Sequence, residues 1–144
     1  IFAKDTAAIP GTGAAGGLGY GFLTFLKAKL ESGIDIILDE IKLEDDIKDA
    51  DFVITGEGKL DFQTAMGKAP IGVAKLAKKY GKKVIAFGGS VTEDAYKCNE
   101  EGIDAFFSIL QLPMTVEEAM EYETARKNLV ATSTQVFRLI NALN

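Results

Sequence analysis

Residues 51–56, Asp51-Phe52-Val53-Ile54-Thr55-Gly56, form a short aromatic and β-branched run that a glycine ends. This pattern is typical of a β-strand that is buried on both faces. Two later stretches follow the same logic, Lys83-Val84-Ile85-Ala86-Phe87-Gly88-Gly89 and Ala105-Phe106-Phe107-Ser108-Ile109-Leu110. The sequence therefore predicts three buried strands.

Segments with apolar residues at helical spacing separate and flank these strands. We expect helices over about residues 18–30, 36–48, 71–80, 93–101 and 116–143. Strands that alternate with helices predict an α/β fold, with a parallel sheet, right-handed crossovers and helices on both faces. Ligands of such sheets collect at the carboxyl ends of the strands. Five aromatic residues are expected in the core: Phe22, Phe25, Phe106, Phe107 and Phe137.

The composition excludes several classes of function. The chain has 144 residues and 47% hydrophobic content, which is ordinary for one globular domain. A net charge of −5 offers no broad basic face for a phosphate backbone, so nucleic acid is not an expected partner. Because the chain contains no histidine, serine-histidine and cysteine-histidine nucleophiles are excluded within it, and so are zinc hydrolase sites.

The location expected from the sequence is the cytoplasm. Cys98 is the single cysteine and cannot form an internal disulfide, and no signal peptide pattern opens the chain. No apolar run approaches the roughly 18 residues that span a bilayer, so no membrane partner is expected.

Five glycines lie between Gly11 and Gly19, directly before a predicted helix. Glycines bring bare backbone N–H groups to an anion, and a helix N-terminus favours phosphate or carboxylate. Gly13, Gly16 and Gly17 are therefore candidate anion ligands, although a purely structural tight loop fits the same pattern. A nicotinamide site is not expected, because the preceding residues 3–6 do not form the buried strand that a dinucleotide fold requires.

Residues 54–70, ITGEGKLDFQTAMGKAP, carry the densest set of functional groups. The segment leaves a strand end, gathers two carboxylates, two lysines, a threonine and an amide around three glycines, and enters the next helix through a proline. The candidate site residues here are Glu57, Gly58, Lys59, Asp61, Gln63, Thr64, Gly67 and Lys68.

Phosphoryl transfer explains this set of groups, because that reaction needs mostly positioning and charge neutralisation. Asp61 or Glu57 could accept the hydroxyl proton or hold magnesium, and Lys68 or Lys59 could neutralise a phosphate or a substrate carboxylate. Spacing alone leaves these roles open. Gly67-Lys68 is not a Walker A loop, because neither the first glycine nor the following Ser or Thr is in place.

Residues 88–92, Gly88-Gly89-Ser90-Val91-Thr92, offer a second candidate region at a strand end. One interpretation is a small phosphate nest that includes Gly89 and Ser90. The other is a helix cap in which Ser90 or Thr92 accepts from backbone N–H groups.

Three segments read together, residues 11–39, 49–90 and 101–110, closely resemble the carboxy-terminal portion of type I glycerate kinases. The part from TGEGKLDFQT to GKAP is the specific one, and the resemblance covers almost the whole chain. It implies phosphorylation of glycerate by ATP with Mg²⁺, at a cleft between a flavodoxin-like α/β domain and a second α/β domain inserted in it. Residues 1–41 would end the inserted domain, and residues 42–144 would form the carboxy-terminal half of the flavodoxin-like domain.

The resemblance also implies which residues serve the cleft. Glu57, Asp61, Gln63, Thr64, Gly67 and Lys68 match the cleft segment, and Gly13, Gly16 and Gly17 match the glycine-rich loop. Lys59 stands where arginine is expected in many relatives, which keeps the charge but loses bidentate recognition. Because such enzymes are much longer, the missing amino-terminal part of the same enzyme is an expected partner, and this chain alone is expected to have little kinase activity. The alternatives are a non-catalytic module that binds a phosphate-bearing ligand and, from a third class, a Rossmann oxidoreductase.

Overall fold

A parallel sheet of three strands in the order β1-β2-β3 organises the chain. The computed structural model describes residues 6–143, and the chain divides into two compact units, Ile1–Glu40 and Ile41–Asn144. The sheet lies in the second unit, and its strands alternate with helices as the sequence predicts, so the α/β class is confirmed. The assignment of the two units to an inserted domain and a flavodoxin-like domain stays a prediction.

In its described part, residues 6–40, the first unit contains two helices, α1 (Ala14–Leu26) and α2 (Gly33–Glu40). Its glycine-rich start is left-handed at Ala15, Gly16 and Gly17, with φ of 49°, 67° and 94°. The helix predicted over about residues 18–30 ends earlier, since the chain leaves α1 at Lys27, which adopts left-handed φ and ψ.

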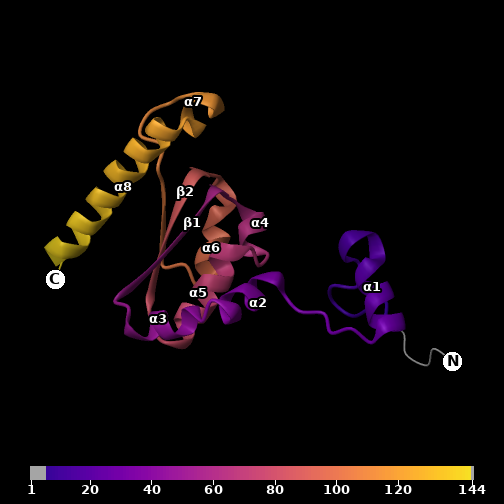
Figure 1. Ribbon diagram of the computed structural model, residues 1–144. Coiled ribbons are helices and arrows are strands. Elements are labelled where there is room, and N and C mark those ends of the chain that lie inside the picture. The colour runs from indigo at the N-terminus through magenta and orange to yellow at the C-terminus, as the bar shows by residue number, and fades with distance from the viewer. Residues whose placement is uncertain (1–5, 144) are drawn as a thin grey trace. The chain divides into compact units, whose positions relative to one another are not determined.

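The second unit begins with α3 and alternates strands with helices. The elements are α3 (Leu43–Asp49), β1 (Phe52–Leu60), α4 (Phe62–Ala65), α5 (Ala69–Lys79), β2 (Lys83–Val91), the 3₁₀ helix η1 (Glu93–Tyr96), α6 (Lys97–Glu100), β3 (Ala105–Ser108), α7 (Val116–Met120) and α8 (Tyr122–Leu143). Figure 1 shows α5 on one side of the strands and α8 on the other. Among residues 6–143, no helix is both long enough and apolar enough to cross a membrane.

The two faces of β2 pack against different helices, because alternate residues of a strand point to opposite faces. Ile85 and Phe87 join Val136 of α8 in one buried cluster. The intervening Val84 and Ala86 are fully buried on the other face, toward α5. Four partly buried apolar residues complete the α8 cluster: Phe52, Phe107, Ile109 and Ile140.

Several predicted features differ from the structure. β1 is buried on one side only, because Ile54 remains 44% exposed. The predicted helix over 36–48 is interrupted at Lys42, which is left-handed, and the one over 116–143 is interrupted at Glu121, which is extended. The core assignment is wrong for three of the five phenylalanines, which are exposed: Phe22, Phe25 and Phe137.

Candidate functional site

Asp61 lies where β1 ends and α4 begins, and its side chain caps that helix. Its Oδ1 accepts hydrogen bonds from the backbone N–H groups of Gln63 at 2.9 Å and Thr64 at 3.2 Å. The residue is 8% exposed. The cap therefore holds the Asp61 carboxylate in one place at the carboxyl end of the strand.

Thr64 connects Asp61 to Glu57. The Thr64 hydroxyl is fully buried; it donates to Glu57 Oε1 and accepts from the Asp61 backbone N–H at 3.2 Å. A buried hydroxyl with both functions satisfied orients its neighbours. Thr64 thus contacts both candidate carboxylates, Glu57 through its hydroxyl and Asp61 through its backbone N–H.

Two lysines flank Asp61 at longer range. Lys59 Nζ lies 3.5 Å from Asp61 Oδ2, and Lys68 Nζ lies 3.8 Å from Asp61 Oδ1. Partial desolvation raises the pKa of Asp61, but the N–H bonds from Thr64 and Gln63 and the two lysine charges outweigh it and place the pKa below its ordinary value. Asp61 is therefore a carboxylate that stays ionised between two cations.

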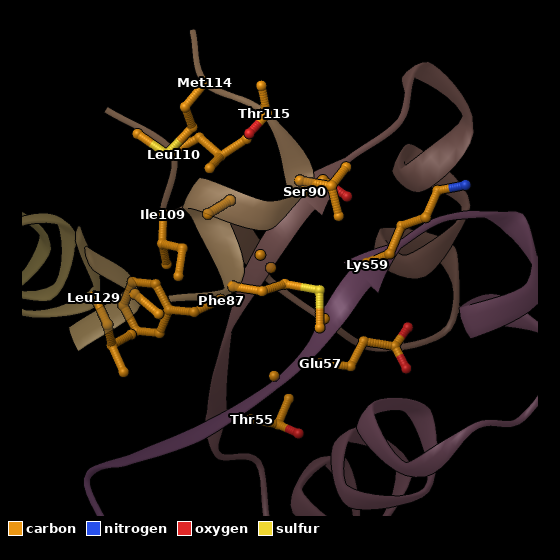
Figure 2. Close-up of a pocket in the computed structure, with 18 of the residues that line it drawn as sticks. Thr55, Glu57, Lys59, Phe87, Ser90, Ile109, Leu110, Met114, Thr115 and Leu129 are labelled. Atoms are coloured by element: carbon orange, nitrogen blue, oxygen red, sulfur yellow. The ribbon is translucent and has the colours of Figure 1, made fainter. Parts of the chain in front are cut away.

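Two cavities border this cluster. The larger has a volume of about 850 Å³, and part of its wall consists of Glu57, Gly58, Lys59, Gly89 and Ser90, with apolar side chains on the rest. Figure 2 shows Glu57 and Lys59 on β1, with Phe87, Ile109 and Leu129 gathered together nearby. The smaller cavity, about 440 Å³, has Lys59 and Asp61 in its wall. Charged residues at the end of β1 therefore border open space: Glu57 and Lys59 at the larger cavity, Lys59 and Asp61 at the smaller one.

Glycines allow β1 and β2 to approach closely at the site. A Cβ atom on Gly89 would lie 2.5 Å from the Gly58 carbonyl oxygen, a distance that a real Cβ does not tolerate. Gly58 lies within β1 and Gly89 within β2. Beyond these glycines the two strands remain paired in parallel, with Lys59 opposite Ser90. The prediction that β1 stops at Gly56 is therefore wrong, and Glu57, Gly58 and Lys59 belong to the strand.

Both interpretations of residues 88–92 need correction. Gly88 to Val91 are the end of strand β2 and do not form a phosphate nest. Thr92 is the residue directly before η1. Its hydroxyl hydrogen-bonds to the Leu60 carbonyl oxygen at 3.2 Å and to the Asp94 carboxylate, and it does not cap a backbone N–H of the helix. Whether Gly89 and Ser90 bind a ligand stays a prediction, and it now rests on their place in the larger cavity.

The other candidates take varied positions. Gln63 is exposed on α4, and Gly67 follows that helix with φ of 103°, in the left-handed region that a side chain disfavours. Gly13, Gly16 and Gly17 lie in the first unit, whereas the other candidates lie in the second. Their role as anion ligands stays a prediction.

Sequence reasoning missed part of the smaller cavity. Four residues after β2 complete its wall together with Phe62: Thr92, Glu93, Asp94 and Tyr96. The signal available was their position just after a predicted strand end, where parallel sheets place ligands. Among residues 6–143, no three Asp, Glu or Cys side chains gather closely enough to hold a metal ion by themselves.

The sequence of this chain is similar to those of known glycerate kinases. The sequence model of the glycerate kinase family matches residues 1–141. The glycerate kinase of Halalkalibacterium halodurans is 49% identical over 135 residues, which are 90% of this chain and 36% of that protein. The glycerate 2-kinase of Escherichia coli is 47% identical over 133 residues, 89% of this chain and 35% of that protein.

A solved structure agrees with the sequence relatives. The crystal structure of a protein assigned as glycerate kinase 2 from Salmonella typhimurium LT2 matches with a TM-score of 0.64 and 40% identity, over 93% of this chain and 34% of that one. This chain thus spans about a third of the length of the relatives it matches. The family model and the curated relatives agree along nearly the whole chain, and it belongs to the glycerate kinase family.

Proposed function

We propose that this chain supplies the phosphoryl-transfer segment of a glycerate kinase, an enzyme that passes a phosphoryl group from ATP to a hydroxyl of glycerate with Mg²⁺. The observation that carries the proposal is the cluster of two carboxylates and two lysines at the carboxyl end of β1, where the charges of Lys59 and Lys68 each lie within 4 Å of the Asp61 carboxylate. Family membership supports the choice of reaction.

The lysines are suited to neutralise phosphate. Their side chains are 57% and 43% exposed, for Lys59 and Lys68 respectively, so both can turn from Asp61 toward a ligand in the cavity. Lysine acts on phosphate as a mobile point charge, which suits a group whose negative charge shifts during transfer. In the absence of nucleotide, Asp61 holds the two ammonium groups near the site.

We assign different roles to the two carboxylates, Asp61 and Glu57. Because its pKa is lowered by two N–H bonds and two cations, Asp61 is a weak proton acceptor and a persistent anion. We assign to it the positioning of the lysines and a share in holding Mg²⁺. Glu57, held by the Thr64 hydroxyl at the edge of the larger cavity, orients the attacking hydroxyl of glycerate.

The residues present fit magnesium. Mg²⁺ is usually held by one or two carboxylates together with water and substrate phosphates, and Asp61 and Glu57 supply two carboxylates joined through Thr64. When bound, the ion neutralises charge on the transferred phosphoryl oxygens.

A non-catalytic phosphate-binding module is the weaker alternative. Such a module would gain affinity from Lys59 and Lys68 but would lose it to Glu57 and Asp61, whose negative charges repel a phosphate. A kinase uses carboxylates of this kind for the metal ion and the hydroxyl.

The proposal is tested in a chimera. The segment of the Halalkalibacterium glycerate kinase that matches this chain is replaced by residues 1–144, and ATP consumption is followed with D-glycerate in a coupled assay. We expect turnover within the range of about 1–100 s⁻¹ that is usual for kinases. A folded chimera that binds ATP but does not turn over would contradict the proposed function.

The isolated chain provides the companion measurement. Since it spans 36% of that relative, we expect the 144-residue polypeptide to consume ATP with glycerate at a negligible rate. Turnover at a normal enzyme rate by the isolated chain would show that the remaining two thirds are not needed for the chemistry.

A further inference from the structure

The smaller cavity, of about 440 Å³, has two exposed aromatic rings in its wall. Phe62, the first residue of α4, is 43% exposed, and Tyr96, the last residue of η1, is 54% exposed. Ala95 and Cys98, close to Tyr96 in the chain, are fully buried, so this segment is packed in place while the Tyr96 ring stays accessible. The cavity is of a size that small ligands occupy, and it lies at the carboxyl ends of β1 and β2, where parallel sheets bind them.

The segment that carries Tyr96 is fastened to the end of β1. The Thr92 backbone N–H, just before η1, donates to the Leu60 carbonyl oxygen at 3.0 Å. After η1, the Cys98 thiol donates to the Asp61 carbonyl oxygen at 3.7 Å. The Tyr96 ring therefore has a fixed place relative to Asp61, the carboxylate that we assign to phosphoryl transfer.

The wall of the cavity carries charges of both signs. Lys59 and Asp61 enter it from the end of β1, and Glu93 and Asp94 enter it from the start of η1. The Asp94 carboxylate accepts from the Thr92 hydroxyl, whereas Glu93 is exposed. Carboxylates repel phosphate and accept hydrogen bonds from N–H donors. Beside η1 the cavity therefore suits a flat, uncharged ring with an amino group better than it suits a phosphate.

We propose that the smaller cavity holds the adenine base of the phosphoryl donor, with the base stacked on Tyr96 and the phosphates directed to Lys59. This inference rests on the proposed function, because it takes the phosphates at the lysines of the cluster. Every base has a flat face that gains affinity by stacking on an aromatic side chain. Tyr96 is assigned to the stacking because the Lys97 ammonium already lies 6.0 Å from the centre of the Phe62 ring.

The direction of Lys59 agrees with this placement. Lys59 borders both cavities, and its ammonium lies 3.5 Å from Asp61 Oδ2, the other charged residue of β1's end that borders the smaller one. Figure 2 shows the Lys59 side chain extending away from Phe87, Ile109 and Leu129 of the larger cavity. A nucleotide whose phosphates bind Lys59 can therefore place its base in the smaller cavity and leave the Glu57 side of the cluster to glycerate.

Other occupants fit the smaller cavity less well. Glycerate has no flat face for Tyr96, and its carboxylate would be repelled by Glu93 and Asp94. Within residues 6–143, no three acidic or cysteine side chains gather closely enough to hold a metal ion by themselves, so the acidic wall does not form a metal site of its own.

The first test is a nuclear magnetic resonance titration of the full 144-residue chain, in which no turnover is needed. Adenosine and inorganic triphosphate are added separately, since each represents one half of the nucleotide. We expect adenosine to shift the amide signals of Phe62 and Tyr96, and triphosphate to shift those of Lys59 and Lys68. D-glycerate is the third ligand and should leave the Phe62 and Tyr96 signals unchanged.

The second test compares tyrosine variants in the chimeric kinase. Tyr96→Ala removes the stacking ring and should raise the KM for ATP about tenfold or more, while kcat and the KM for D-glycerate change less than about threefold. Tyr96→Phe keeps the ring and should restore most of the lost affinity. Tyr122→Ala is the matched control, because Tyr122 is 74% exposed and lies in the wall of neither cavity.

Two results would overturn the inference. One is that adenosine leaves the Phe62 and Tyr96 signals unchanged, or that glycerate shifts them instead. The other is a KM for ATP that is the same in Tyr96→Ala and Tyr122→Ala, with circular dichroism showing both variants folded. If Tyr96→Ala does not fold, the titration of the unchanged chain decides.

Failure of this inference is distinguishable from failure of the proposed function. If adenosine shifts the Tyr96 signal but the chimera does not turn over, the base site stands and the chemistry is wrong. If the chimera turns over and Tyr96→Ala leaves the KM for ATP unchanged, the chemistry stands and the base site is wrong.

Discussion

The Thr64 hydroxyl donates a hydrogen bond to the Glu57 carboxylate across the junction of α4 and β1. The same oxygen accepts from the Asp61 backbone N–H, and the Thr64 backbone N–H donates to the Asp61 carboxylate, so one fully buried residue contacts both carboxylates proposed for the reaction. The arrangement makes the orientation of Glu57 depend on a side chain that need not touch any ligand.

Replacing Thr64 with valine removes this link at nearly constant volume. Thr64→Val leaves the Asp61 N–H and one Glu57 oxygen without their partner, so we expect the free energy of unfolding to fall by about 1–3 kcal/mol. Chemical denaturation of the purified chain measures it. Thr64→Ser, which keeps the hydroxyl, should lose less. If the valine variant proves as stable as the unchanged chain, the hydrogen bonds of the Thr64 hydroxyl do not contribute to stability.

The close approach of β1 and β2 predicts opposite outcomes for two glycines. Gly89→Ala would drive its Cβ to 2.5 Å from Gly58 O and should cost about 1–3 kcal/mol of unfolding free energy. Gly58→Ala meets no atom within 4 Å and should change stability by less than about 1 kcal/mol. Thermal unfolding of the two variants side by side decides the matter. Equal effects would contradict the strand geometry.

Asp104 predicts a dependence of stability on pH. Desolvation raises the pKa of Asp104, but hydrogen bonds from Lys78 and the Val84 N–H and the charges of Lys78 and Lys83 outweigh it and hold the pKa below its ordinary value. A lowered pKa stabilises the fold above the unfolded value of about 3.9. This contribution is lost as the pH falls from there through the folded pKa.

Asp104→Asn should therefore reduce the fall in the free energy of unfolding that occurs as the pH is lowered. The measurement is the free energy of unfolding by urea between about pH 2 and pH 6. Asp46→Asn, at an exposed position on α3, serves as the control and should show the same pH dependence of the unfolding free energy as the unchanged chain. If Asp104→Asn loses stability at low pH as much as the unchanged chain does, the lowered pKa of Asp104 is contradicted.

Cys98 should react slowly with thiol reagents in the native chain. The residue is fully buried beside the Asp61 carbonyl, and desolvation, followed by the charges of Glu57, Asp61 and Asp94, raises the pKa of its thiol. We expect iodoacetamide to modify it only through opening of the fold, and much faster in denaturant. Modification at the same rate in native and unfolded protein would contradict its burial.

The sequence was a good guide to the existence and order of the strands. Runs such as Val84-Ile85-Ala86-Phe87 are apolar at every position, and the structure buries them between α5 and α8. Proline also served well, since Pro70 stands in the first turn of α5 as predicted. These signals are local and depend on few distant contacts.

The errors came from glycines and from helix breaks. Gly56 was interpreted as the end of a strand, whereas its missing side chain lets β1 run past Phe87, where a Cβ would lie 2.4 Å from the carbonyl oxygen. The break between α7 and α8 arises at Glu121, whose carboxylate accepts from Thr124 N at 2.8 Å and starts the second helix. Neither effect has a periodic signature, because each depends on a specific three-dimensional contact.

The site could be predicted as a segment but not as an arrangement. Residue types between positions 57 and 68 indicated carboxylate and lysine chemistry, and the structure places the Lys59 and Lys68 charges beside Asp61 and the Glu57 carboxylate on Thr64. The sequence could not show that Asp61 is committed to a helix cap, since spacing does not distinguish a capping carboxylate from a free one.

The most direct measurement compares binding and turnover in the Asp61→Asn form of the chimeric kinase. Asparagine also caps helices well, so the fold around α4 should persist while the negative charge between Lys59 and Lys68 is lost. The account predicts that kcat with D-glycerate falls about 10²-fold or more while the Kd for ATP changes by less than about tenfold. Unchanged kcat in the folded variant would contradict the assignment of this cluster to phosphoryl transfer.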